Sequence, residues 1–262
     1  MQPPIHPSAV IDPTAQIGAG VEIGPFCVVG PKVVLEDGVI LKSHVVVTGD
    51  TVVGEGTVIF PFAVIGEIPQ DKKFDGEETR LRIGKRNRIR EHVTMNCGTE
   101  GGGGVTRIGD DGLFMAGCHI AHDSQIGDRV IVVNSVAIAG HVVLEDDVIV
   151  GGLSGVHQWV RVGRGAIIGG MTKVLHDVIP YGLVQSKRGE LEGLNLIGLK
   201  RRGVPREDIA ALRAAYQHLA TGEGTFQERA RALGDTAQSA YVREIVDFVL
   251  GASDRAFLTP GD

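Results

Sequence analysis

The sequence predicts a mainly β protein, a parallel β-helix of hexapeptide repeats followed by a C-terminal α-helical part. An aliphatic side chain returns at every sixth residue through most of the first 174 positions. The 262 residues include 38 Gly but only 8 Phe, 3 Tyr and 1 Trp, which favours many short strands and turns over a helical bundle. Beyond Pro205 the apolar spacing changes to that of amphipathic helices.

The six-residue period indicates a chain that bends after every hexad. The residue four positions after each aliphatic is small or β-branched, as in Ala9, Cys27 and Ala63, so both can point into one core. Three hexads close a coil of 18 residues, and 26 hexads make roughly nine coils. The repeated residues are Ile5, Ile11, Ile17, Ile23, Val29, Leu35, Leu41, Val47, Val53, Ile59, Ile65, Ile83, Ile89, Met95, Ile108, Phe114, Ile120, Ile126, Val132, Ile138, Leu144, Val150, Val156, Val162, Ile168 and Val174.

Two segments break this register, near residues 69–82 and 98–105. We expect each to leave the stack as a loop on a binding face. The second contains four consecutive glycines, residues 101–104, without the Lys-Ser/Thr of a phosphate-binding loop, and is interpreted as a flexible flap. The predicted domains are a β-helix over residues 1–184, ending its repeat at Pro180-Tyr181, and an α-helical domain over residues 185–262.

The C-terminal segment contains two helical stripes of apolar residues, within 209–219 and 242–250. Between them Thr225-Phe226-Gln227-Glu228 predicts a capping box that opens a third helix. We expect these helices to cover the last coil, whose open end would otherwise expose apolar side chains. The basic run Lys200-Arg201-Arg202 either is a solvated surface or attracts an acidic partner protein.

Composition argues against several classes of protein. No apolar run reaches the roughly 18 residues of a membrane span, and no signal peptide is recognisable, so a cytoplasmic protein is expected. The net charge of -6 argues against nucleic-acid binding. Cys27, Cys97 and Cys118 lack metal-type spacing, and Cys27 and Cys118 are predicted to be buried reduced thiols.

The segment 118–123 places two imidazoles and a carboxylate within this regular scaffold. His122 is the third residue of its hexad and His119 the sixth of the previous one, so neither occupies an inward position. Residues 18 apart lie on neighbouring coils, roughly 4.8 Å from one another. Steps of 18 therefore bring together on one flank His122, Gly140, His141, His157 and Gln158.

These groups suit acyl transfer. An imidazole can remove a proton from a hydroxyl near neutral pH, and Asp123 would fix the tautomer of His122 and raise its basicity. The backbone N–H of Gly140 suits an oxyanion. Because Ser124 and Cys118 should point inward, we expect direct attack by an acceptor hydroxyl, with no acyl-enzyme and no cofactor. No metal is predicted, and zinc held by three histidines is the competing interpretation.

Seven motifs carry a family resemblance: Ile23-Gly24-Pro25-Phe26-Cys27-Val28-Val29-Gly30-Pro31, Leu41-Lys42-Ser43-His44-Val45-Val46-Val47, Arg86-Asn87-Arg88-Ile89-Arg90-Glu91, His119-Ile120-Ala121-His122-Asp123, Ala139-Gly140-His141-Val142, Val156-His157-Gln158 and Gly198-Leu199-Lys200-Arg201-Arg202-Gly203. Together they closely resemble the acyl-carrier-protein:UDP-N-acetylglucosamine O-acyltransferases over nearly the whole chain. The resemblance implies a left-handed β-helix and a homotrimer with its site between subunits. It also implies transfer of a 3-hydroxyacyl chain from acyl carrier protein to the 3-hydroxyl of UDP-N-acetylglucosamine, the first step of lipid A synthesis.

The resemblance also implies roles for single residues. His122 corresponds to the general base, Asp123 to its supporting carboxylate and Gly140 to the oxyanion donor. Contacts with the sugar nucleotide or the acyl chain are implied for Asp71, Lys73, His119, His141, His157 and Gln158. Contacts with the uridine diphosphate or the carrier's phosphopantetheine are implied for Asn195, Arg201 and Arg202. A 3-amino analogue of the acceptor stays open.

Three alternatives are retained. The N-acyltransferase that acts later in the same pathway normally has an extra N-terminal domain, for which coils that start at Ile5 leave no room. Acetyltransferases that use acetyl-CoA share the fold. A β-helix without any catalytic role would share the periodicity alone.

Overall fold

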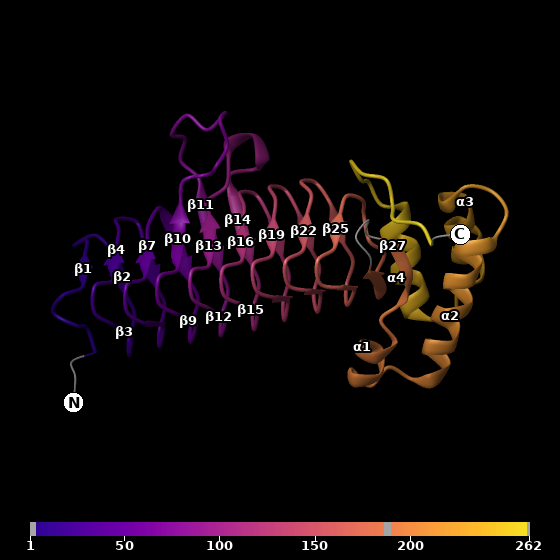
Figure 1. Cartoon of the computed structure of the whole chain (residues 1–262), viewed down its shortest axis with the longest axis horizontal. Coiled ribbons are helices and arrows are strands. Elements are labelled where there is room, and N and C mark those ends of the chain that lie inside the picture. The colour runs from indigo at the N-terminus through magenta and orange to yellow at the C-terminus, as the bar shows by residue number, and fades with distance from the viewer. Residues whose placement is uncertain (1–3, 186–189, 261–262) are drawn as a thin grey trace.

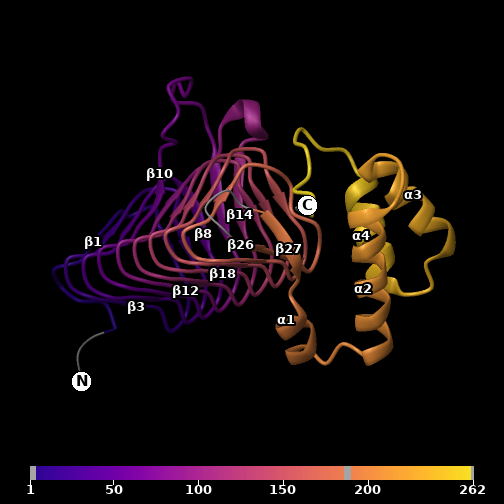
Figure 2. The same ribbon diagram turned by 45° about the vertical axis from the view of Figure 1, so that its right-hand side comes forward.

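The chain forms a prism of stacked coils with a group of helices at its C-terminal end (Figure 1). The computed structural model describes residues 4–185 and 190–260. Seen obliquely along the prism, the coils lie behind one another as similar loops (Figure 2). Strands of successive coils pair in parallel on three faces. The predicted fold class, a left-handed β-helix followed by an α-helical part, is confirmed.

Each face of the prism is one sheet, numbered here in chain order. The first face contains β1 (Val10–Ile11), β4 (Val28–Val29), β7 (Val46–Val47), β10 (Val64–Glu67), β13 (Thr94–Asn96), β16 (His119–Ile120), β19 (Ala137–Ile138), β22 (Gly155–Val156) and β25 (Lys173–Val174). The second contains β2 (Gln16–Ile17), β5 (Val34–Leu35), β8 (Asp50–Val53), β11 (Arg80–Ile83), β14 (Val105–Ile108), β17 (Gln125–Ile126), β20 (Val143–Leu144) and β23 (Arg161–Val162). The third contains β3 (Glu22–Ile23), β6 (Ile40–Leu41), β9 (Val58–Ile59), β12 (Arg88–Ile89), β15 (Leu113–Phe114), β18 (Ile131–Val132), β21 (Ile149–Val150), β24 (Ile167–Ile168), β26 (Gly182–Gln185) and β27 (Glu190–Leu194).

Three edges join the faces, and each is built from short turns. The first edge, between the first and second faces, contains Asp123 and His141, the second edge contains Arg129, and the third edge contains Phe26. All four residues adopt a left-handed backbone conformation, with φ between 55° and 61°. Because L-residues rarely adopt this conformation, the stacking of the coils has to hold each turn in place.

The spacing between stacked residues changes at the two register breaks. Ile120 pairs with Ile138, which is the regular step of one coil. At the first break Val64 pairs with Thr94, and at the second Thr94 pairs with His119, so both of these steps are longer than a regular coil. The additional residues leave the first edge as loops 68–79 and 97–104, the second of which includes the 3₁₀ turn η1 (Glu100–Gly102). Both rise from the same side of the prism beside β11 and β14 (Figure 1).

Inward side chains from the three faces fill the prism. In one coil Ile120, Ile126 and Val132 are at most 4% exposed, and burying each contributes about 1.5–3 kcal/mol. The predicted burial of Cys27 and Cys118 as free thiols is confirmed. Burial raises the pKa of the Cys118 thiol to about 12, which keeps it protonated and unreactive at neutral pH.

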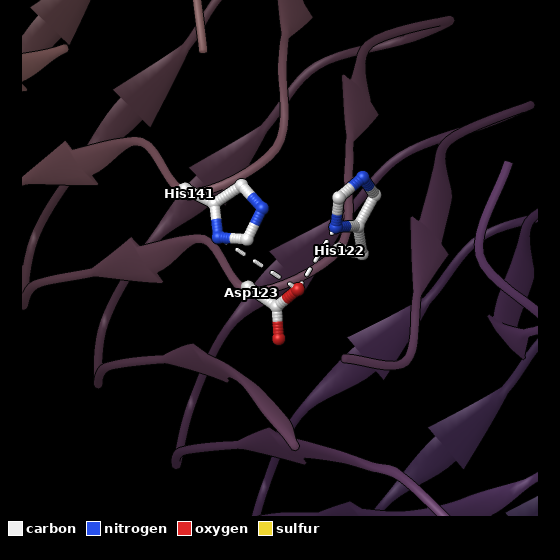
Figure 3. Close-up of side chains that lie close together, drawn as sticks. All are labelled: His122, Asp123 and His141. Atoms are coloured by element: carbon white, nitrogen blue, oxygen red, sulfur yellow. Dashed lines mark hydrogen bonds and ion pairs between the residues drawn. The ribbon is translucent and has the colours of Figure 1, made fainter. Parts of the chain in front are cut away.

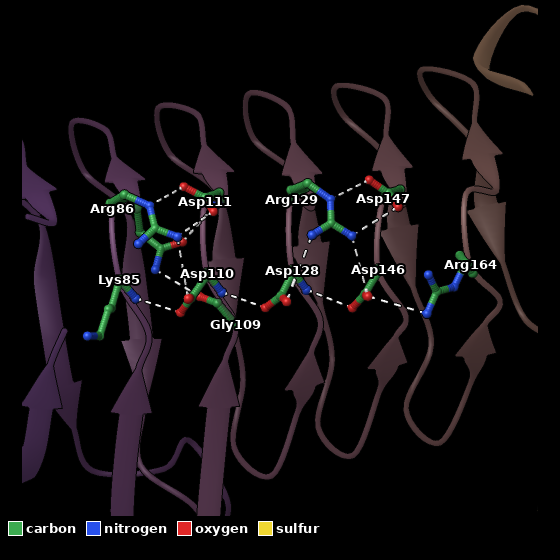
Figure 4. A network of polar contacts seen from close by, with 12 residues as sticks. Lys85, Arg86, Gly109, Asp110, Asp111, Asp128, Arg129, Asp146, Asp147 and Arg164 are labelled. Carbon is green, nitrogen blue, oxygen red and sulfur yellow. Dashed lines mark hydrogen bonds and ion pairs between the residues drawn. The ribbon is translucent and has the colours of Figure 1, made fainter. Parts of the chain in front are cut away.

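A ladder of charged side chains follows the second edge (Figure 4). The Asp128 carboxylate accepts the N–H of Asp110 at 2.7 Å, and the Asp146 carboxylate accepts the N–H of Asp128 at 2.9 Å. Arg129 Nε in turn donates to Asp147 on the next coil at 2.8 Å. Since the ion pairs are partly exposed to solvent, the ladder orients the turns more than it adds stability.

The C-terminal part contains α1 (Leu196–Arg201), α2 (Arg206–Thr221), α3 (Phe226–Thr236) and α4 (Ala240–Leu250). The predicted capping box is present, because the Thr225 hydroxyl accepts the N–H of Glu228 and the Glu228 carboxylate accepts the N–H of Thr225. The apolar stripes of α2 and α4 bury residues such as Leu212 and Val249. In the described part of the chain, no helix combines the length and apolar character needed to cross a bilayer.

The coils end later than the sequence pattern indicates. The six-residue pattern places the end of the repeat at Pro180-Tyr181, but β26 pairs in parallel with β24, and β27 then pairs with β26 in the antiparallel sense. Because the segment after Val174 is irregular, counting in steps of six residues does not find β26. Strand pairing therefore crosses the predicted domain boundary between residues 184 and 185, which stays a prediction.

Asp177 joins the last coil to the tail, the part of the chain that follows β27 and contains α1 to α4. Its carboxylate is fully buried and accepts hydrogen bonds from Arg161 Nε at 2.7 Å and from the Ser253 hydroxyl at 2.6 Å. The Arg161 guanidinium lies 4.4 Å from the ring centre of Phe248 on α4, and the Asp177 carbonyl accepts the N–H of Leu258. One buried carboxylate thus connects three segments that are distant in the sequence.

Replacing Asp177 by Ala is expected to lower the free energy of unfolding by about 3–5 kcal/mol, because it leaves the Arg161 guanidinium partly buried without its carboxylate. Thermal and urea unfolding followed by circular dichroism measure the loss. Glu78→Ala, which removes one partner of the exposed Lys32–Glu78 pair, is the control and should leave the midpoint unchanged. Equal stability of the Asp177 variant and the control would contradict this role.

Candidate active site

His122 and Asp123 form a hydrogen-bonded pair on the first edge (Figure 3). His122 Nδ1 lies 2.9 Å from Asp123 Oδ2. An ionised carboxylate can only accept, so Nδ1 carries the proton and Nε2 keeps its lone pair. The His122 side chain is 13% exposed whereas the carboxylate is fully buried. The imidazole therefore binds the carboxylate through Nδ1 and leaves the basic Nε2 free.

Gly140 lies directly against the His122 ring on the next coil, as the regular repeat step predicts. A Cβ atom at position 140 would lie 2.6 Å from His122 Cε1 and 2.7 Å from Nε2, so only glycine fits. Among the described residues, the N–H of Gly140 has no backbone acceptor. A free backbone donor thus lies beside the basic nitrogen.

The Asp123 carboxylate is held from above by the loop 97–104. Thr99 donates its N–H to Oδ1 at 2.9 Å and its hydroxyl to Oδ2 at 2.6 Å. A Cβ atom at Gly102 would lie 2.1 Å from Asp123 Cγ. The glycine-rich segment, which the sequence predicts to be a flexible flap, packs closely on the carboxylate, because glycines allow its backbone to approach.

His119 and His141 flank the pair. His119 Nδ1 lies 2.7 Å from the Thr94 hydroxyl, and burial together with the nearby His122 lowers the pKa of His119. His141 stacks on Trp159 with 3.7 Å between ring centres, and burial lowers its pKa although Asp123 opposes the shift. Burial thus favours the neutral form of both imidazoles.

A pocket of about 470 Å³ opens beside the pair on the first face. Its floor includes Ala137 and Gly155, which stack in register between His119 on one side and Lys173 on the other. The two small residues leave a hollow between larger neighbours. The pocket is also lined by Gln70, His119, His122, Gly140, His157 and Leu175.

The remaining predicted contacts lie at different distances from this pocket. The charge of Asp71 partly opposes the lowering of the His141 pKa. The Asp71 carboxylate also accepts the N–H of Lys73. His157 lines the pocket, whereas Gln158 is exposed beside it. Arg255 from the tail donates to His157 Nδ1 at 2.9 Å.

The tail residues predicted to bind the nucleotide or the carrier are on another edge of the same chain. Asn195 caps α1 by accepting the N–H of Gly198, and its amide donates to the carbonyl of Gly165 on the second edge. Arg202 lies 6.0 Å from the ring centre of Tyr181, also on the second edge. Arg201 is exposed at the end of α1. One chain therefore does not bring these three residues to the His122 pocket.

Sequence reasoning missed several residues of the site. Trp159 stands one regular coil after His141 and could have been found by the same step that found Gly140. Thr99 lies in an insertion, and Arg255 in the tail, where repeat arithmetic gives no position. Thr94 pairs with His119 across the second insertion, so the regular step does not relate these two residues.

The arrangement favours proton transfer over covalent or metal chemistry. Ser124 and Cys118 are fully buried, as expected, so neither reaches the pocket as a nucleophile. His122, Asp123 and His141 present atoms within 4.8 Å of one another that could hold a metal ion. Asp123 Oδ2 already accepts from the Thr99 hydroxyl and from His122 Nδ1, so an ion bound at this oxygen would compete with both donors.

Comparisons with known proteins identify the family. A model described as UDP N-acetylglucosamine O-acyltransferase, domain 2, matches residues 177–258, and one described as bacterial transferase hexapeptide (six repeats) matches residues 14–49. The acyl-[acyl-carrier-protein]–UDP-N-acetylglucosamine O-acyltransferase of Paracoccus denitrificans is 68% identical over 203 residues, which cover 78% of this chain and 77% of that protein. The chain belongs to the UDP-N-acetylglucosamine O-acyltransferase family. The resemblance predicted from the seven motifs is thereby confirmed.

Solved structures of UDP-N-acetylglucosamine O-acyltransferases agree over nearly the full length. A crystal structure of a UDP-N-acetylglucosamine acyltransferase superposes with a TM-score of 0.95 at 42% identity and covers 98% of this chain and 99% of that one. The structure of LpxA from Acinetobacter baumannii gives 0.94 at 38% identity and covers 98% of this chain and 100% of that one. The C-terminal helices therefore belong to the family fold together with the β-helix.

Proposed function

We propose that this chain transfers a 3-hydroxyacyl chain from acyl carrier protein to the glucosamine 3-hydroxyl of UDP-N-acetylglucosamine. This reaction is the first step of lipid A synthesis, and we place it in the cytoplasm and without a cofactor. The proposal depends on one observation, the His122–Asp123 pair set against the free N–H of Gly140 inside the pocket. The names of the relatives, which specify acyl carrier protein and UDP-N-acetylglucosamine, support both substrates.

The proposed mechanism is general-base catalysis. His122 Nε2 accepts the proton of the 3-hydroxyl while that oxygen attacks the thioester carbonyl carbon. The N–H of Gly140 stabilises the negative charge that develops on the carbonyl oxygen. When the tetrahedral intermediate collapses, the C–S bond breaks and His122 returns the proton to the leaving thiolate. Asp123 stabilises the imidazolium between these two transfers.

The shape of the pocket supports a long aliphatic donor. Ala137 and Gly155 leave an apolar hollow along the first face, and Val156 and Leu175 extend it. An acetyl group would occupy only a small part of this hollow. We therefore favour an acyl carrier protein donor over acetyl-CoA. The polar contacts proposed around the hollow are Asp71, Lys73, His119, His141, His157 and Gln158.

Replacing His122 by Ala should lower turnover by at least about 100-fold, the usual contribution of a general base, without unfolding the protein. The assay compares 3-hydroxyacyl carrier protein with acetyl-CoA, each together with UDP-N-acetylglucosamine. The wild-type protein should use the first donor alone. His218→Ala, which changes an exposed histidine on α2, is the control and should retain full activity.

Three outcomes would remove this assignment. Near-normal turnover of the His122 variant would show that another group is the base. Preference for acetyl-CoA would place the chain among the acetyltransferases. Stoichiometric zinc in the purified protein, bound through His122 and His141, would favour the metal-dependent alternative.

We propose that carrier protein docks at the basic segment that begins with Lys200. A pocket of about 770 Å³ there is lined by Lys200, Arg206 and Arg213 together with the apolar Val204 and Ile209. An acidic partner would be attracted by the three charges, and its lipid-bearing arm could contact the apolar part.

Replacing Arg201 or Arg202 by Ala should raise the KM for carrier protein, because each substitution removes an exposed positive charge that attracts the acidic partner. Added salt should weaken carrier use further, since it screens the remaining charges. Initial rates at several ionic strengths measure both effects. Arg231→Ala, on the exposed side of α3, is the matched control. A defect that does not depend on salt would instead indicate direct contact with the nucleotide.

We also propose that the chain assembles as a homotrimer. The third edge exposes apolar side chains, with Phe26 59%, Phe62 50%, Leu153 66% and Met171 68% accessible, and neighbouring copies would cover them. Light scattering during gel filtration should give three times the chain mass, and Phe62→Glu should reduce it. A monomeric wild-type protein would contradict the proposal.

A further inference from the structure

Thr99 binds both oxygens of the Asp123 carboxylate. Its N–H donates to Oδ1 at 2.9 Å and its hydroxyl donates to Oδ2 at 2.6 Å. Thr99 itself is 7% exposed, and the carboxylate it binds is fully buried. A buried carboxylate has lost its hydration, so these two donors replace water as its partners.

The loop that contains Thr99 is built to make this contact. Thr99 also closes the loop at its far end, because its carbonyl accepts the N–H of Gly104 at 2.8 Å. Added Cβ atoms at Gly98 and Gly102 would lie 2.7 Å and 2.1 Å from atoms of the Asp123 carboxylate. The main chain of Asp123 is held as well, because the Thr106 hydroxyl accepts its N–H at 2.8 Å.

We infer that Thr99 is a positioning residue that aims the Asp123 carboxylate at His122, an inference that rests on the proposed function. Oδ2 accepts from the Thr99 hydroxyl and from His122 Nδ1 at the same time. The hydroxyl fixes the direction of this oxygen and takes up part of its negative charge. The insertion at residues 97–104 thus serves the chemistry through the Asp123 carboxylate.

Removal of the Thr99 hydroxyl should strengthen proton binding by the His122–Asp123 pair. Without the hydroxyl, the carboxylate keeps more of its charge uncompensated. The His122–Asp123 pair then binds a proton more readily, whichever of the two groups receives it. The other titratable groups nearby are His141, with Nδ1 at 3.9 Å from Oδ2, His119, which interacts with His122, and Asp71, which interacts with His141. These groups are the same in wild type and variant, so a difference between the two reports on Thr99.

The test compares Thr99→Val, which removes the hydroxyl but keeps the N–H and the shape, with Thr99→Ser, which keeps the hydroxyl. In the valine variant, the acid limb of the kcat/KM profile should move up by about one pH unit and kcat should fall about tenfold, with KM unchanged for both substrates. The serine variant should resemble wild type in all three respects. Thr57→Val is the matched control, because it removes another fully buried hydroxyl, which donates to Gly84 far from His122.

A second measurement separates this inference from the proposed function. The His122 ring is titrated by NMR in wild type and in Thr99→Val, with its signal assigned from the His122→Ala variant. Its midpoint should rise in the valine variant whichever substrates the enzyme uses. An unchanged midpoint and acid limb, with only a lower melting temperature, would overturn the positioning role and leave His122 as base intact. If Thr99→Val has wild-type activity and His122→Ala is also fully active, the result would instead reject His122 as the base.

Discussion

Main-chain hydrogen bonds between successive coils are the constraint on which this structure depends. Each two-residue strand is too short to be stable alone, and it persists because parallel neighbours on both sides pair with it. The pairing fixes equivalent residues of neighbouring coils above one another, as with His119 and Ala137. It also holds edge residues such as His141 and Trp159 in left-handed turns that they would not adopt alone. Side chains on the edges thereby stand in fixed columns, each supported by the coils before and after it.

The three edges use this rigidity in different ways. The second edge is regular and charged, and its aspartates accept N–H groups of the preceding turns. The third edge stacks Phe26, His44 and Phe62 and leaves apolar surface exposed. The first edge is the irregular one, because both insertions leave the prism there. Irregular chain is needed where a carboxylate must be buried, since a repeat of two-residue strands and tight turns has no segment that can cover a side chain on its edge.

Burial and charge meet at Asp123. The carboxylate is inaccessible to water, yet it accepts three hydrogen bonds, two from Thr99 and one from His122. A buried carboxylate without its partners would destabilise the folded protein. The loop must therefore approach Asp123 closely enough to donate to it, which its glycines allow. Asp177 repeats this arrangement at the C-terminal end of the prism, where Arg161 and Ser253 surround it. One buried carboxylate orients the imidazole and the other attaches the tail.

The six-residue aliphatic period is enough to predict the coil, because such a period has few physical solutions, and it predicts which residues stack wherever the coil keeps its regular length. The stacking of Gly140 on His122 follows from that regular step alone, and the position of Trp159 could have followed from it. The contacts of the insertions and the tail, in contrast, depend on how the chain packs in three dimensions. Thr99 reaches Asp123 across the second insertion and Arg255 reaches His157 from the far end of the chain, and no period relates either pair. The same limit explains the added strand β26, which continues the stack after the aliphatic pattern is lost. A repeat predicts which residues stack only while every coil has the same length. Beyond that point, packing alone decides which residues contact one another.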